Sequence, residues 1–91
     1  MTTQEKIDTV CSNFATFLKE KNKRYGDSAI APIKIFSKSD SGSQICNRID
    51  DKLMRVKNST DLRKNDIADI LGYTILLLIE KNWLDFEDLL D

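Results

Sequence analysis

Residues 44–73 read QICNRIDDKLMRVKNSTDLRKNDIADILGY, and this stretch decides the fold. Apolar residues recur at spacings of three and four on both sides of a polar break at Lys57–Thr60, which predicts two consecutive amphipathic helices. Each helix carries charged side chains beside its apolar stripe. We therefore expect any chemistry to lie between these charged stripes, with the loop from Lys21 to Ala29 completing the site.

The remaining sequence predicts further helices around this pair. Apolar spacing predicts a first helix over about residues 3–22, begun by Thr2 or Thr3 with Glu5 and ended near Gly26. Pro32 disfavours regular structure over 28–36, where we expect a helical turn or irregular packing and no strand. Residues 37–43 are small and polar and predict a flexible loop.

The second helix is expected to begin near Ser41–Ser43 and to end at the polar break. Ser59, Thr60 or Asp61 is expected to cap a third helix that runs from about Asp61 to Glu80 and ends at Lys81 and Asn82. One or two amphipathic turns are expected over 83–90. The prediction is an all-α single domain over 1–91, a small antiparallel bundle of three main helices plus a short C-terminal helix.

Composition narrows the class of protein. The chain has 91 residues and a net charge of −1, so nothing points to nucleic acid as the main partner. It contains no histidine, so a metal site would need oxygen ligands. Cys11 and Cys46 share no metal-ligand spacing and fit reduced thiols in a cytoplasmic protein. No signal peptide or membrane-spanning run is visible.

The third helix places Asp66, Asp69 and Tyr73 on one face. Two carboxylates one turn apart repel each other, and a bound Mg²⁺ would remove that repulsion while keeping waters for a phosphate substrate. The alternative is a solvated acidic pair near a helix amino terminus, where negative charge is favoured anyway. Beyond Gly72 this helix is apolar nearly all round, which predicts a subunit interface, with burial in the core of a monomer as the alternative.

The second helix places Arg48, Asp51, Lys52 and Arg55 on one face. Such a group offers one metal ligand and three cations for phosphate oxygens. The alternative is a solvated face of ion pairs. Lys52 lies at the edge of the apolar stripe and is expected to point partly inward.

The loop after the first helix reads Lys21-Asn22-x-x-Tyr25-Gly26-Asp27-Ser28-Ala29. Lys21 is a candidate nucleotide-binding cation, Tyr25 could stack on a base and Asn22 could hydrogen-bond its edge. The alternative is a helix cap with a tyrosine closing the core.

Together and in this order, the three motifs resemble the phage and bacterial family called nucleotide modification associated domain 1, over roughly Lys21 to Leu78. That family is similar to the MazG-like all-α nucleoside triphosphate pyrophosphatases. The resemblance implies a dimeric or tetrameric helical bundle, with Mg²⁺ held by acids on two helices, that cleaves a (deoxy)nucleoside triphosphate to the monophosphate and pyrophosphate.

Carried over residue by residue, the resemblance implies that Asp51, Asp66 and Asp69 bind the metal and, with Lys52, make up the catalytic group. Lys21, Asn22, Tyr25, Arg48, Arg55 and Tyr73 would bind the nucleotide. The Glu-Glu-x-x-Glu of the first acidic helix in that group is replaced here by residues 48–52, of which only Asp51 lies on the favoured face. Glu20 could supply a further acid.

Three hypotheses follow. The first is a Mg²⁺-dependent pyrophosphohydrolase of the nucleotide pool, from a phage or prophage. The second is a non-catalytic protein that binds or sequesters a nucleotide or cyclic nucleotide. The third is a small helical interaction module. The sequence leaves open whether the protein is an enzyme.

Overall fold

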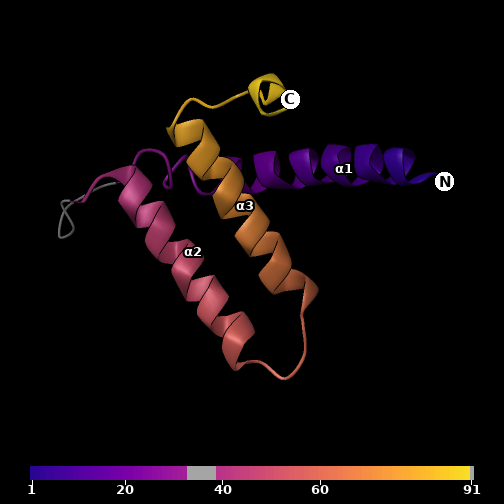
Figure 1. Cartoon of the computed structure of the whole chain (residues 1–91). Helices are drawn as coiled ribbons and strands as arrows, with labels where there is room; N and C mark the ends of the chain where they lie inside the picture. Colours follow the sequence, from indigo (N-terminus) through magenta and orange to yellow (C-terminus); the bar gives the residue numbers. More distant parts are fainter. Residues whose placement is uncertain (33–38, 91) are drawn as a thin grey trace.

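The structure is a computed structural model that describes residues 1–32 and 39–90. It contains three α-helices, α1 (Thr3–Arg24), α2 (Ser41–Asn58) and α3 (Lys64–Glu80), and one 3₁₀ turn, η1 (Glu87–Leu89). Helices α2 and α3 lie side by side as an antiparallel hairpin, and the C-terminal half of α1 crosses one end of it (Figure 1). The all-α prediction is confirmed, and the described residues include no strand.

Helix α1 begins where the sequence predicts. The Thr2 hydroxyl accepts the backbone N–H of Glu5, and the Glu5 carboxylate accepts the backbone N–H of Thr2. The Thr2 backbone N–H also holds the pKa of Glu5 below its ordinary value. The helix ends at Arg24, two residues later than expected, and Gly26 follows with a φ of 57°.

Helix α2 begins at Ser41, which confirms the predicted start near Ser41–Ser43, although these residues also belong to the segment for which we predicted a flexible loop. Asp40 is its N-cap and accepts the backbone N–H of Ser43 at 2.8 Å. Ser41 and Gly42 are buried in the first turn, so the loop prediction is wrong for 41–43. Residues 37 and 38 lie outside the described range, as do 33–36; residues 28–32 form a turn, as expected.

Helix α3 begins at Lys64, three residues later than expected. The Ser59 hydroxyl donates to the backbone carbonyl of Asp61 at 2.7 Å, and the N-cap is Arg63, which makes no side-chain capping bond. The predicted cap at Ser59, Thr60 or Asp61 is therefore wrong. The predicted end is confirmed, because Lys81 caps the helix and Asn82 has a φ of 57°.

The predicted C-terminal helix is reduced to the single turn η1. We expected Trp83 and its neighbours to pack on the bundle or on a second chain. Residues 83–90 are exposed along their whole length in the single chain, so packing on a second chain stays a prediction. A helix of one or two turns is not stable in water unless it packs on something. In the described part of the chain the large apolar side chains of this segment are at least half exposed.

Little of the apolar surface is buried. Among the described residues, Ile45 is the one large hydrophobic side chain that is fully buried, at 1% exposed. The N-terminal half of α1 extends clear of the hairpin (Figure 1). None of the helices in the described ranges is long and apolar enough to cross a membrane.

Candidate functional site

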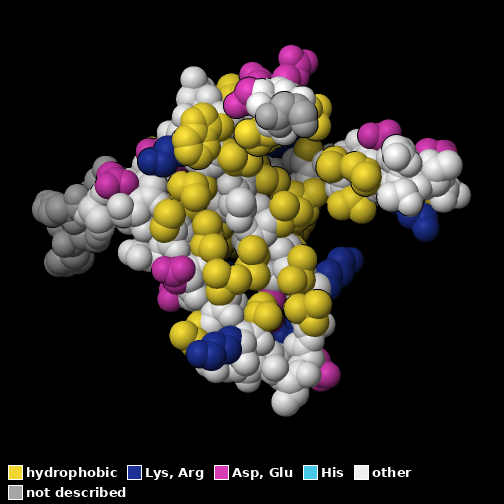
Figure 2. Space-filling model, viewed as in Figure 1, with side chains coloured by type: hydrophobic (Ala, Val, Ile, Leu, Met, Phe, Trp, Pro, Cys, Tyr) yellow, Lys and Arg dark blue, Asp and Glu magenta, His cyan; other side chains and the backbone are white. Residues whose placement is uncertain are grey.

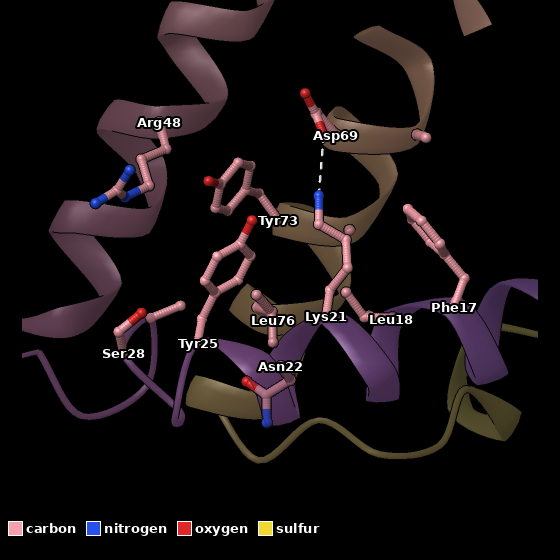
Figure 3. Close-up of a pocket in the computed structure, with 13 residues that line it drawn as sticks. Phe17, Leu18, Lys21, Asn22, Tyr25, Ser28, Arg48, Asp69, Tyr73 and Leu76 are labelled. Carbon is pink, nitrogen blue, oxygen red and sulfur yellow. Dashed lines mark ion pairs between the residues drawn. The ribbon is translucent and has the colours of Figure 1, made fainter. Parts of the chain in front are cut away.

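A cavity of about 310 Å³ lies between the C-terminal half of α1, the turn after it and the hairpin. Figure 3 shows the side chains around it. Those that line it come from three separated stretches of sequence: Phe17, Leu18, Lys21, Asn22, Tyr25, Ser28, Ala29, Arg48, Ala68, Asp69, Gly72, Tyr73 and Leu76. Its size is at the lower end of the range of small-molecule sites.

Gly72 lets α1 approach α3 closely beside the cavity. A Cβ atom at this position would lie 3.4 Å from Cδ1 of Leu18 and 3.7 Å from Cζ of Phe14. These distances leave room for a methyl group but not for a larger side chain. The fully buried Gly72 therefore sets the spacing between the two helices, and with it the width of the cavity.

Asp69 lines the cavity and is held by two lysines, of which Lys21 also lines it and Lys52 lies behind it. Its carboxylate lies 3.1 Å from Nζ of Lys52 and 3.7 Å from Nζ of Lys21. The side chains of Asp69 and Lys52 are only 14% and 18% exposed, so this pair is partly shielded from water. The expectation that Lys52 points inward is confirmed. One carboxylate and two cations from three helices therefore meet here.

Aromatic rings and cations alternate around the rest of the cavity. The Arg48 guanidinium lies 5.9 Å from the Tyr73 ring centroid, and Nζ of Lys21 lies 5.4 Å from that of Phe17. The Tyr25 hydroxyl points toward Tyr73 (Figure 3). Tyr25 is 65% exposed, so its ring is available to a ligand.

The turn after α1 is fixed by its own side chains. The Asn22 amide nitrogen donates to the Asp27 carboxylate, and Gly26 and Asp27 both have a φ near 57°. In Figure 3 the Asn22 amide points away from the two tyrosine rings. Asn22 thus holds the turn that carries Tyr25, and one of its two amide N–H groups is engaged by Asp27.

Four predicted site residues do not line the cavity: Lys52, which reaches Asp69 from α2, and Asp51, Arg55 and Asp66. Asp66 is 2% exposed and accepts from Nε of Arg63 at 3.1 Å, so the alternative of a solvated acidic pair is wrong for it. Asp51 is exposed. Arg55 lines a separate hollow with Met54 and Arg63, at the connection between α2 and α3. Glu20, the additional acid, pairs with Arg24 at 3.1 Å.

The positions of these carboxylates decide whether the expected Mg²⁺ site can form. The carboxylates of Asp66 and Asp69 both neutralise basic side chains, and Asp51 joins neither of them. In the two described ranges, no group of three or more acidic or cysteine residues is placed to hold a metal ion. The three predicted ligands do not fit a metal ion in this arrangement.

Sequence reasoning missed the apolar part of the lining. Phe17 and Leu18 belong to the apolar spacing that predicts the first helix, and Leu76 lies in the apolar part of the third helix beyond Gly72, so the sequence assigned none of them to a site. Phe17 precedes Lys21 by four residues, which places them on the same face of a helix, and this spacing was the available signal.

Comparison with protein-family models, with curated proteins and with solved structures finds no match to this chain.

Proposed function

We propose that this protein binds a nucleotide in the cavity between α1 and the α2–α3 hairpin. The observation that supports this best is the meeting of Tyr25, Tyr73, Lys21 and Arg48 around one cavity. Aromatic rings stack on nucleobases with little dependence on sequence, at about 1–3 kcal/mol per base. Lysine and arginine pair with phosphate oxygens through charge-assisted hydrogen bonds. A nucleotide with its base stacked on the tyrosines would therefore have its phosphates near Lys21 and Arg48.

The two ion pairs of Asp69 differ in strength, so one of the two lysines can turn from Asp69 to a ligand. Lys21 lies 3.7 Å from the carboxylate and is 39% exposed, so the ammonium can turn to a phosphate oxygen at small cost. Lys52, at 3.1 Å and more buried, is the firmer of the two contacts. A ligand phosphate would thus compete with Asp69 chiefly for Lys21.

The test is a screen of nucleoside triphosphates and cyclic nucleotides by thermal shift and then by calorimetry, with and without Mg²⁺. A ligand that binds only the folded chain raises its stability by mass action. We expect Tyr25→Ala to weaken binding about tenfold or more, because it removes a stacking ring that is exposed and outside the core. Trp83→Ala is the control, since this exposed aromatic residue does not line the cavity. Equal losses in both variants, or no ligand from the screen, would contradict the proposal.

A second candidate is the Mg²⁺-dependent pyrophosphohydrolase that the sequence motifs imply. What favours it is the position of Asp69, a carboxylate at the wall of a cavity that also presents cations suited to phosphate. Asp51, Asp66 and Asp69 would be its metal ligands, and Asp66 would have to give up Arg63.

Asp69→Asn separates the two candidates. A hydrolase that needs this carboxylate would lose turnover. A binder would gain affinity for an anionic ligand, roughly fivefold, because two lysines lose their counter-charge. The variant should also lower the melting temperature, since it leaves the partly buried Lys52 unpaired. Turnover with Mg²⁺ in the wild type and none in the variant would select the hydrolase.

We further propose that the chain acts in the cytoplasm as a homo-oligomer, in a phage or prophage setting. Support for the compartment comes from Cys11 and Cys46, which are both free thiols, as in proteins of a reducing environment.

A further inference from the structure

A second, larger cavity lies on the other side of α1. It has a volume of about 780 Å³ and is a groove between α1, the turn at residues 30–31 and the C-terminal half of α3. Val10, Phe14, Ile75 and Ile79 are among the side chains that make it apolar. Val10 is 59% exposed and Ile79 is 45% exposed. Figure 2 shows hydrophobic side chains gathered over the hairpin and on α1, with few charges among them.

The exposed area is too large for a chain that stands alone. A monomeric protein of 10.4 kDa exposes about 5,400 Å² on the usual scaling. This chain exposes 7542 Å². The seven residues outside the described ranges would expose at most about 1,200 Å² if fully extended, so at least about 900 Å² of excess belongs to the rest. A standard protein interface buries about 800 Å² on each partner.

We propose that this groove binds a second copy of this chain, with the two α1 helices packed antiparallel. The same helix supplies one wall of the groove and, in its N-terminal half, an unpartnered apolar ridge that includes Ile7 and Val10. An interface about a two-fold axis needs such a self-complementary surface. The N-terminal half of α1 of one copy fills the groove of the other.

The charges along α1 favour this direction of packing. The first half of the helix has a net negative charge, from Glu5, Lys6 and Asp8, and the second half has a net positive charge, from Lys19, Glu20, Lys21, Lys23 and Arg24. Lys19 and Lys23 line the rim of the groove. At about 100° per residue, Asp8, Lys19 and Lys23 lie on one flank of the helix. An antiparallel pair centred near Phe14 sets the acidic half of each copy against the basic half of the other, whereas a parallel pair sets like charges together.

The first experiment measures mass by sedimentation or light scattering from about 1 to about 100 µM. The wild type should be a dimer or a multiple of it at the upper end. Val10→Glu should raise the dissociation constant at least about tenfold, because it puts a charge into the apolar contact. Val10 is mostly exposed in the single chain, so circular dichroism should show an intact helical fold. Asn13→Glu is the matched control and should associate like the wild type, because Asn13 is exposed and does not line the groove.

Charge exchange tests the direction and the identity of the partner. Asp8→Lys alone should weaken self-association, and adding Lys19→Glu should restore it, since the two positions meet only across an antiparallel pair. Thiol labelling gives an independent measure. Cys11 lines the groove and should react more slowly as the protein is concentrated, whereas Cys46 on α2 should react at the same rate throughout.

Three results would overturn the inference. The wild type could remain monomeric at every concentration, which would leave the groove to a different partner. Asn13→Glu could dissociate the protein as strongly as Val10→Glu. The double charge exchange could fail to restore what Asp8→Lys removes.

Discussion

Gly72 is the residue whose replacement best tests how the cavity is built. Gly72→Ala should raise the free energy of unfolding by about 0.5–1 kcal/mol, because alanine favours the helix and the added Cβ meets Leu18 and Phe14 at ordinary distances. Gly72→Val should lower the stability by about 1–3 kcal/mol, because the extra methyl groups overpack the contact between α1 and α3. Chemical denaturation of both variants measures these changes. A destabilised Gly72→Ala variant would mean that the two helices are closer than described.

The carboxylate of Asp40 makes the stability of the fold depend on pH in the acid range. The backbone N–H of Ser43 holds the pKa of Asp40 below its ordinary value of 3.8. A depressed pKa means that the folded state favours the charged form, so the cap contributes stability above pH 3.8, and this is lost as the pH falls through the lower folded pKa. Asp40→Ala should have a lower melting temperature than the wild type at neutral pH, and the difference should shrink below pH 3.8. A constant difference across this window would contradict the prediction.

At the level of the elements, the start of α3 sets two effects against each other. Arg63→Ser would introduce a capping side chain worth about 1 kcal/mol. It would also remove the charge-assisted bond to the buried Asp66, worth about 1.5–3 kcal/mol. The loss is larger, so we expect a net destabilisation of about 1 kcal/mol in denaturant unfolding. Arg63→Lys keeps the charge but loses the Nε donor, so its free energy of unfolding should lie between those of the wild type and Arg63→Ser. A stabilised Arg63→Ser variant would show that Asp66 does not depend on Arg63.

The sequence predicts the helices well because their signals are local. Apolar spacing found α1, α2 and α3, and the positive φ at Gly26 and Asn82 follows from residue types that tolerate it. The start of α3 was missed because the Ser59 hydroxyl bonds within its own loop instead of capping a helix. The conformation of the loop between the helices decides which residue caps the next helix. The spacing of apolar residues in the sequence does not contain this information.

The candidate site was predicted in part, and the errors have a geometric cause. A helical wheel groups Arg48, Lys52 and Arg55 correctly by direction, but it discards height along the axis. Arg55 is seven residues beyond Arg48, about 10 Å further along α2, and α1 crosses only the other end of the hairpin. Asp66 and Asp69 share a face, yet only Asp69 lies level with Lys21. Position along the hairpin therefore decides which predicted residues meet, and this depends on where α1 docks.

On the scale of the whole molecule, the protein consists of a hairpin and one long helix held to it near one end. All three helices contribute to the candidate cavity, whereas the N-terminal half of α1 takes no part in it. Hydrogen exchange should therefore be slowest in the facing turns of α2 and α3 and should become faster toward the start of α1 in dilute protein. Exchange at Ile7 and Val10 as slow as at Ile45 under dilute conditions would contradict this description.

Because α1 is held to the hairpin near one end, a small rotation there moves its other end by a larger distance. Leu18 is at the middle of the contacts of α1 with the hairpin, between Phe14 and Lys21, and Thr3 is fifteen residues from Leu18, about 22 Å along the axis. A tilt of about 5° at the contact moves the amino-terminal end by about 2 Å on this length. Leu18 also forms part of the wall of both cavities. Binding in either cavity would therefore act on α1 at the point about which it rotates. A distance label near Thr3 would thus report, with amplification, on events at the opposite end of the helix.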